Sequence, residues 1–565
     1  MSELTHTCVE SLEVGASPVV HHFLRRLRLL SFFEQYLPAA ATGRPELLET
    51  ARTLVALVGH LLLARHPLYA IAPWIAQRVP EHFGLHPDEV SLCNDDRLGR
   101  AVEHLFGADC ASLFTALILH VVRAFSVDIS QIHNDSTTIT LSGEYAGQAD
   151  PEKKDRAPLI AKGYNKDHRP DLKQLLYCLT VSADGAVPVH FKIYDGNTTD
   201  DQTHRHTWLR VAEVVGNSDF LYVADSKLCS HDNLAFIGGK NGRFLTVMPR
   251  TWKEWSLLQK YVQEQPESLW CEISKEPAKR GRAKAPNIYW GFEYPKKTEG
   301  GYRLLCYRSS RKMKDDALAR QRKLQRFRQW NQTHSAKPKR FDSVAKAEEY
   351  GKRQVQEKKV TPWVRCWVQE RRQTHKKQVG RGRPGPQTPY ETREEIWYEA
   401  AFAEDQEAIE ADAKWDGMFS LITNDVSLKL KEVLEKYKYQ PFLEKRFEQM
   451  KTVFGVMPVW LKKPERISGL LFVYFVVLLV QALLEREVRL KMKEQKIEEL
   501  PLYPEGRMTK RPTAELILSA FEGLRRHRLM DERGCALRTF HDPLSPVARQ
   551  ILQLLGVDSS PFGFP

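Results

Sequence analysis

The sequence predicts a mixed α/β protein in which helices flank a sheet, a β-rich insertion interrupts that sheet, and an all-helical region precedes it. Three observations support this prediction. Up to residue 126, apolar residues recur three and four positions apart, as they do in helices. Strand-like and helical stretches then alternate over 127–250, which indicates a mixed sheet. Over 251–415, clusters of basic residues alternate with short β-like runs.

The chain of 565 residues is too long for one simple core, so we expect several segments. Its formal net charge of +13 favours a polyanionic partner, either nucleic acid or an anionic membrane. The expected segments are a helical N-terminal region (1–126), a first core part (127–250), the insertion (251–415), a second core part (416–500) and a helical C-terminal tail (501–565).

Cysteine usage and the chain start favour a cytoplasmic protein. The nine cysteines are scattered without a CxxC pair, which argues against a zinc ribbon and favours reduced thiols. Residues 1–15 lack the apolar core of a secretory signal. The apolar stretch 467–484 is at the short end of a membrane span and contains Ser468, Gly469 and Gln481. We therefore expect it to be a buried core helix, and we expect no membrane partner.

Turn and helix signals define two further elements. Asp184-Gly185 separates two β-rich runs and predicts a hairpin over 173–197. The pattern of 513–528 predicts a helix in the C-terminal tail.

Two aspartates are placed unusually for their strands. Asp135 lies inside "IHNDSTTITL", although aspartate is disfavoured in strands and a buried one must be paired or bind a metal. The alternative is that it faces solvent. Asp225 ends the apolar run "FLYVAD", and sites in open α/β sheets lie beyond the carboxyl ends of strands. The alternative for Asp225 is a cap on the helix that follows.

A third carboxylate lies on a predicted helix that begins at Pro441. Leu443, Phe447, Met450 and Phe454 form one apolar stripe that should face the core. Glu444 borders this stripe, so we expect it to be half-buried. Read alone, the segment is an ordinary amphipathic helix, with Glu448 paired to Lys451 one turn on.

The spacing Tyr437-x2-Gln440-x3-Glu444-x6-Lys451 resembles the Tyr-Arg-Glu-Lys signature of DDE transposases from bacterial insertion sequences. Further stretches resemble the same family over about residues 20–520: "CNDDRLGRAVEHLF", "HNDSTTITLSGEY", "GYNKDHRPDLKQL", "GNTTD", "LYVADSK" and "KPERISGLLFVYFVVLL". Gln440 departs from the signature, because it stands where the family has arginine and so removes one expected phosphate contact.

This resemblance implies an RNase H-like catalytic core that cleaves DNA at element ends and joins them to target DNA. Asp135, Asp225 and Glu444 would be the catalytic residues and would hold two Mg²⁺ ions, which Mn²⁺ can replace. Glu448 and Glu435 would then be surface charges. A homodimer on paired terminal inverted repeats in the bacterial cytosol is also implied. The residues expected along the DNA are Tyr437, Gln440 and Lys451.

The basic insertion is expected to add DNA affinity. Arg381-Gly382-Arg383-Pro384 resembles the core of an AT-hook, which enters a narrow A·T minor groove, and the alternative is a flexible basic loop. Three tryptophans could stack on a displaced base or pack in a core: Trp252, Trp255 and Trp290. The helical N-terminal region is expected to read the inverted repeats.

Two alternatives to transposition remain open. One is an RNase H-like metal-dependent nuclease without strand transfer, and the other is a domesticated DNA-binding protein without catalysis. A separate cluster, His204 and His206 near Asp200 and Asp201, could suggest a metal site. Because acids favour a helix start, we expect this cluster to be a solvent-exposed helix end.

Overall fold

The computed structural model describes residues 8–38, 48–64, 66–145, 157–167, 169–277, 285–453, 461–531, 533 and 535–563. These residues belong to two compact units. The first comprises Met1–Val247, Thr423–Ser427 and Glu432–Pro565, and the second comprises Met248–Ile422 and Leu428–Lys431. The expected insertion, 251–415, falls within the second unit.

The first unit contains a mixed sheet with the strand order β4-β3-β2-β5-β6. Neighbours β2 and β3, and β3 and β4, are antiparallel, whereas β2 and β5, and β5 and β6, are parallel. The prediction of a mixed α/β fold is confirmed. The strands are β2 (Gln131–Leu141), β3 (Lys173–Ser182), β4 (Pro188–Tyr194), β5 (Leu221–Ala224) and β6 (Arg243–Val247).

The predicted hairpin is present as β3 and β4. Its turn contains Gly185 in the left-handed region, with φ of 79°, where a side chain would be strained. The Asp-Gly signal was therefore a reliable guide to this connection.

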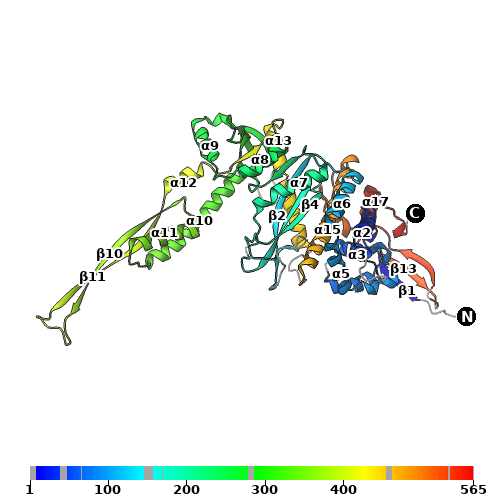
Figure 1. The fold of residues 1–565 in the computed structure, drawn as a ribbon, viewed down its shortest axis with the longest axis horizontal. Helices are drawn as coiled ribbons and strands as arrows, with labels where there is room; N and C mark the ends of the chain where they lie inside the picture. Colours follow the sequence, from blue (N-terminus) through cyan, green and yellow to red (C-terminus); the bar gives the residue numbers. More distant parts are fainter. Residues whose placement is uncertain are drawn as a thin grey trace. The chain divides into compact units, whose positions relative to one another are not determined.

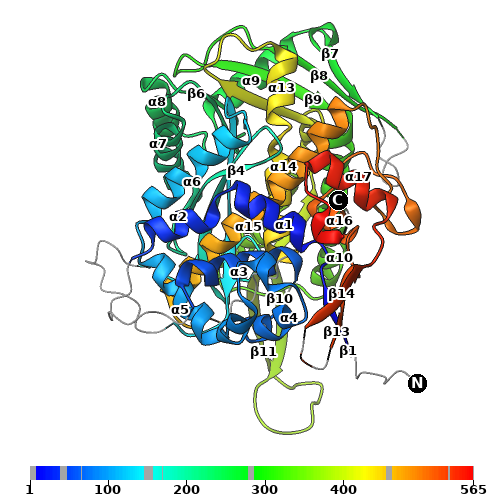
Figure 2. The same ribbon diagram turned by 90° about the vertical axis from the view of Figure 1, so that its right-hand side faces the viewer.

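The helices of the first unit pack partly on this sheet and partly on one another (Figure 2). They are α1 (Ser17–Arg26), α2 (Leu29–Tyr36), α3 (Thr50–Leu63), α4 (Ile71–Ala76), α5 (Asp95–Phe106), α6 (Cys110–Ala124), α7 (Thr203–Val215), α8 (His231–Gly239), α14 (Gln440–Glu448), α15 (Pro464–Glu494), α16 (Ala514–Ser519) and α17 (Pro546–Leu555). A further helix, α13, spans Leu430–Tyr437.

Helix α15 is the central helix of the first unit and contacts α3 and α5. A Cβ atom added to Gly469 would lie 2.0 Å from the carbonyl oxygen of Val102, so only glycine permits this approach of α15 to α5. The helix is long and apolar enough to cross a membrane, and two bent helix pairs of the described residues also qualify if each counts as one span. In the structure, 94% of the most apolar window of α15 is buried inside the protein, which confirms the expected core helix.

The two ends of the chain are not wholly helical, contrary to prediction. Strand β1 (Cys8–Glu13) pairs antiparallel with β13 (Arg525–Met530), which also pairs with β14 (Ala536–His541). The acidic β1 meets the basic β13, and Glu10 lies opposite Arg528. The helix predicted over 513–528 is correspondingly shortened to α16. Partners so distant in sequence leave no local pattern to detect.

The second unit carries a sheet with the order β12-β9-β8-β7 and a separate two-stranded hairpin, β10-β11. Figure 1 shows this hairpin extending beyond α10 and α11. The strands are β7 (Cys271–Glu276), β8 (Asn287–Glu293), β9 (Arg303–Ser309), β10 (Val364–Gln378), β11 (Tyr390–Glu404) and β12 (Met418–Thr423). The helices are α9 (Lys253–Glu264), α10 (Ser310–Ala336), α11 (Val344–Glu357) and α12 (Gln406–Ala413).

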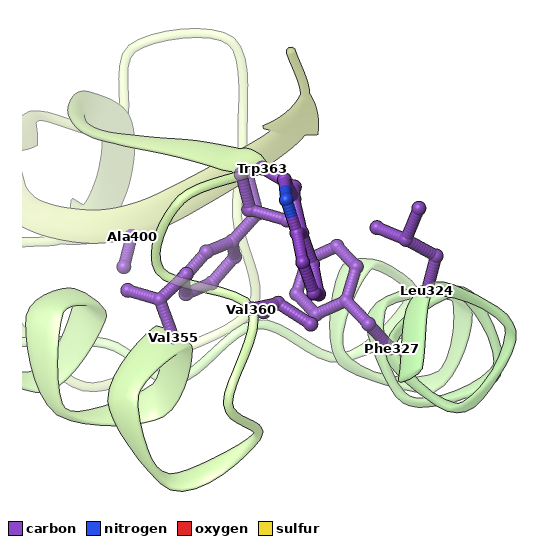
Figure 3. Packing of buried hydrophobic residues seen from close by; sticks show 8 residues of the cluster. Leu324, Phe327, Val355, Val360, Trp363 and Ala400 are labelled. Carbon is purple, nitrogen blue, oxygen red and sulfur yellow. The ribbon is translucent and has the colours of Figure 1, made fainter. Parts of the chain in front are cut away.

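The helical content of the second unit corrects the prediction of a β-rich insertion. The basic clusters over 308–330, which were expected to alternate with β-like runs, belong mostly to the long helix α10. Leu324 and Phe327, about one turn apart on this helix, are both buried on one face. They pack with Val355, Trp363 and Ala400 into a hydrophobic cluster at the base of the hairpin (Figure 3).

Candidate active site

Strand pairing brings Asp135 and Asp225 together. Asn134 of β2 pairs with Ala224 of β5 in a parallel register, so the next residue of each strand lies at the same level. Asp225 follows the last residue of β5, and its Oδ1 atom accepts a hydrogen bond from the Lys227 amide at 3.0 Å. The two aspartates therefore lie side by side at the carboxyl end of β5.

The surroundings of these aspartates disfavour their charged forms. Burial raises the pKa of Asp135 to about 7, Lys166 opposes this rise, and Asp225 and Asp200 add to it. Burial also raises the pKa of Asp225. The Lys227 amide and Lys166 oppose this rise, and Asp200 adds to it. Neighbouring carboxylates with raised pKa values mark a functional site more often than an ordinary surface.

Two further residues belong to this cluster: Lys166, which the sequence did not single out, and Asp200, which was expected at a solvent-exposed helix end. The Lys166 ammonium lies 3.0 Å from Asp200 Oδ2 and 3.8 Å from Asp135 Oδ1. The Ser136 hydroxyl donates to Asp200 Oδ1 at 2.8 Å. Both residues lie in stretches quoted above for their resemblance to transposases, "GYNKDHRPDLKQL" and "GNTTD". Asp200, however, begins a helical turn, and that pattern alone is typical of a structural acid.

Glu444 lies on α14 and is exposed, not half-buried as expected. Its link to the aspartates is Tyr437. Burial raises the pKa of the Tyr437 phenol, and the negative charges of Asp225, Glu444 and Asp135 raise it further. All three predicted carboxylates thus lie within electrostatic range of one phenol. The other stripe residues that the structure describes, Leu443 among them, are buried as predicted, and Phe454 lies outside the described residues.

The donor set suits a hard divalent cation, because carboxylate oxygens are the ligands that Mg²⁺ prefers. The mutual repulsion of Asp135 and Asp225 is what such an ion would relieve. Among the described residues, however, no three His, Cys, Asp or Glu side chains are grouped closely enough to hold a metal ion. The structure therefore brings the two aspartates together but does not place Glu444 in one ligand set with them.

Gln440 serves as a structural link between α14 and β2. Its side chain is 7% exposed, its Oε1 atom is 2.8 Å from His133 Nδ1, and its Nε2 atom donates to the Asn134 carbonyl at 3.1 Å. Its amide is thus occupied by protein partners. In this protein Gln440 therefore has a packing role, and its amide does not project freely toward a phosphate.

Lys451 follows α14 in a short π-helical turn, Gln449–Val453. Its ammonium donates to both carboxylate oxygens of Asp167, at 2.9 Å each. Glu448 and Glu435, expected to be surface charges, are both exposed.

The predicted DNA contacts of the insertion lie in the second unit. Arg381 and Arg383 are exposed in the connection between β10 and β11. Trp255 is buried and packs edge-on against Trp415, whereas Trp252 and Trp290 are partly buried.

The expected exposure of His204 is wrong. Helix α7 turns His204 inward, where it is 3% exposed and its Nδ1 atom lies 3.2 Å from the Tyr222 hydroxyl. His206 is half-buried, with its Nε2 atom 2.9 Å from the Lys192 ammonium. The start of the helix was predicted correctly, but the packing of its His204 face against the sheet was not.

Comparison with known proteins establishes no family. No protein-family model and no curated protein matches the sequence. A piggyBac transposase synaptic complex with hairpin DNA is 10% identical, with 82% of this chain and 73% of that chain covered and a TM-score of 0.32. A pre-cleavage Mos1 transpososome is 10% identical (37% and 61% covered, TM-score 0.14), and a Mos1 mariner paired-end complex with Mn is 9% identical (40% and 65% covered, TM-score 0.14). Similarity this low leaves the function to be argued from the chain's own residues.

Proposed function

We propose that this protein is a DNA transposase that cleaves element ends and transfers the freed 3′ ends into target DNA. The observation that carries the proposal is the pairing of Asn134 with Ala224, which sets Asp135 beside Asp225. The order of three antiparallel strands followed by two parallel ones supports an RNase H-like core. The spacing of the Tyr437 to Lys451 segment supports the branch with the Tyr-Arg-Glu-Lys signature.

In this proposal Asp135, Asp225 and Glu444 would hold two Mg²⁺ ions, or Mn²⁺ in their place. When bound, such ions stabilise charge on the attacking and leaving oxygens of an in-line displacement at phosphorus. Because Glu444 is exposed on α14, its carboxylate is solvated before metal binding and the protein buries no unpaired charge there. Tyr437 and Lys451 would contact phosphate near the cleaved bond, with Lys451 exchanging Asp167 for the DNA.

The protein's partners would be the terminal inverted repeats and target DNA. The N-terminal region, residues 1–126, would read the repeats, and Arg381 and Arg383 would add phosphate contacts from the insertion. We further propose a homodimer on paired ends, acting in the bacterial cytosol.

The test is incubation of the purified protein with a labelled element end, a target plasmid and Mg²⁺. Joined product supports transposition, whereas nicks without joining support the nuclease alternative. Binding without cleavage supports the non-catalytic alternative. Addition of EDTA should abolish cleavage but not binding.

Substitution of the carboxylates tests the site itself. Asp135→Asn, Asp225→Asn and Glu444→Gln should each lower nicking by more than about a hundredfold, since loss of even outer-shell partners of a metal costs up to that much. Glu448→Gln is the matched control, because Glu448 is exposed one turn further along α14. Unchanged nicking in Glu444→Gln would remove Glu444 from the site.

A further inference from the structure

The loop that holds Lys166 is fixed to the strand that carries Asp135. Asn165 is 7% exposed, and its Nδ2 atom donates to the Thr140 hydroxyl of β2 at 3.3 Å. Its Oδ1 atom accepts from the Asp167 amide at 2.8 Å. Lys166 therefore projects from an anchored turn.

The Lys166 ammonium lies among oxygen atoms at the centre of the acidic cluster. It donates to the Ser136 carbonyl at 2.6 Å and to the Ser136 hydroxyl at 2.9 Å. It also contacts the carboxylates of Asp200 at 3.0 Å and Asp135 at 3.8 Å. Its side chain is only 29% exposed, so water screens these charges incompletely.

One ammonium thus faces two carboxylates, and Asp225 acts on both Lys166 and Asp135 through its charge. A divalent cation at Asp135 would seek the same oxygens and would be repelled by the ammonium at this range. We propose that Lys166 is an internal counter-ion, which neutralises Asp135 and Asp200 before metal binding and must withdraw when a divalent cation binds. This inference rests on the proposed function in one respect, namely that Asp135 is a metal ligand.

Metal affinity separates this role from a structural one. Loss of a lysine that only braces the loop would leave metal binding unchanged or weaken it. Loss of a counter-ion removes a competitor and tightens metal binding. Asp200 has the matching role, because its carboxylate and the Ser136 hydroxyl orient the ammonium.

The experiment is Mn²⁺ titration of the full chain, with free Mn²⁺ followed by electron paramagnetic resonance. Lys166→Met should lower the Mn²⁺ Kd roughly tenfold, equal to about 1.4 kcal/mol. Lys162→Met is the matched control, because Lys162 is exposed on the same loop, and its Kd should match that of the natural protein. In EDTA, and at alkaline pH so that the carboxylates are charged, Lys166→Met should also unfold at a lower temperature than Lys162→Met, because the carboxylates then repel without compensation.

An unchanged or higher Mn²⁺ Kd in Lys166→Met would overturn the proposal. If that variant does not fold, Lys166→Gln provides the same test with a polar side chain of smaller volume. Asp135→Asn separates the two levels of inference. If it binds Mn²⁺ as tightly as the natural protein, the metal-site assignment fails. If it loses Mn²⁺ while Lys166→Met shows no gain, only the counter-ion proposal fails.

Discussion

The fold holds the Asp135 carboxyl group in surroundings that disfavour its charged form. Its side chain is 21% exposed, and its Oδ1 atom accepts a hydrogen bond from the Ser136 amide at 2.7 Å. Burial outweighs this bond and the nearby ammonium of Lys166, and it raises the pKa of Asp135 from 3.8 to about 7. A cation bound at Asp135 and a proton are therefore alternatives at neutral pH.

This shift predicts a pH-dependent difference between the natural protein and Asp135→Asn in EDTA. The native pKa lies above the unfolded value, so between about pH 4 and pH 7 the native state keeps a proton that the unfolded state releases. The stability of the natural protein relative to the variant should therefore fall as pH rises through this window and level off above it. Urea unfolding at a series of pH values measures the difference. A flat difference would mean that Asp135 titrates near 3.8 in the native protein.

The sequence predicted the three carboxylates of the candidate site, but it did not predict the lysine that balances their charge. Asp135 and Asp225 stood out because each interrupts or ends a strand, and Glu444 stood out only through its spacing from Tyr437. Lys166 could not be found in this way, because its role depends on a loop folding back over β2.

At the scale of elements, the orientation of α14 depends on one buried guanidinium. Arg446 is 3% exposed, and it donates to the carbonyls of Ala186 and Gly185 in the β3–β4 turn at 3.0 and 2.9 Å. It also lies 3.1 Å from Glu485 of α15. Burial alone would raise the pKa of Glu485, but Arg446 and Arg489 lower it, so the carboxylate stays charged. This network joins the helix of Glu444 to the sheet and to the central helix.

Glu485→Ala should therefore destabilise the first unit by about 3–5 kcal/mol, because it leaves the Arg446 charge buried and uncompensated. Glu494→Ala is the control on the same helix, since Glu494 pairs with Lys491 at the surface and should cost less than about 1 kcal/mol. Urea unfolding compares the two variants. Equal losses would mean that the buried pair contributes no more than the exposed one.

Elements with a local signal were predictable, and elements that depend on distant partners were not. The hairpin around Gly185 and the core helix over 467–484 follow from turn chemistry and apolar composition. The pairing of β1 with β13 joins opposite ends of the chain, and no local pattern reports it. In the insertion, dense positive charge obscured the buried apolar residues of α10.

At the scale of the whole molecule, the candidate active site and the long hairpin belong to different compact units. The first contains every residue of the candidate active site, and the second contains the β10-β11 hairpin. The hydrophobic cluster around Phe327 and Trp363 stabilises only the base of that hairpin. Residues 371–377 and 391–396 are exposed throughout, on both strands. Because a free two-stranded hairpin is marginally stable in water, contact with a partner would stabilise its distal part.

If that partner is DNA, Arg381→Ala with Arg383→Ala should weaken duplex binding and reduce its salt dependence. Each phosphate contact contributes about 0.9 to the slope of log K against log salt concentration, so the slope should fall by up to about 1.8. A control with the same loss of charge is Lys346→Ala with Lys352→Ala, because these ammonium groups already pair with Asp342 and Glu348 on or beside α11. Fluorescence anisotropy over a salt series measures both. A loss confined to A·T-rich duplex indicates AT-hook binding, a loss on all duplexes indicates a basic loop, and an unchanged slope excludes the hairpin tip from the DNA interface.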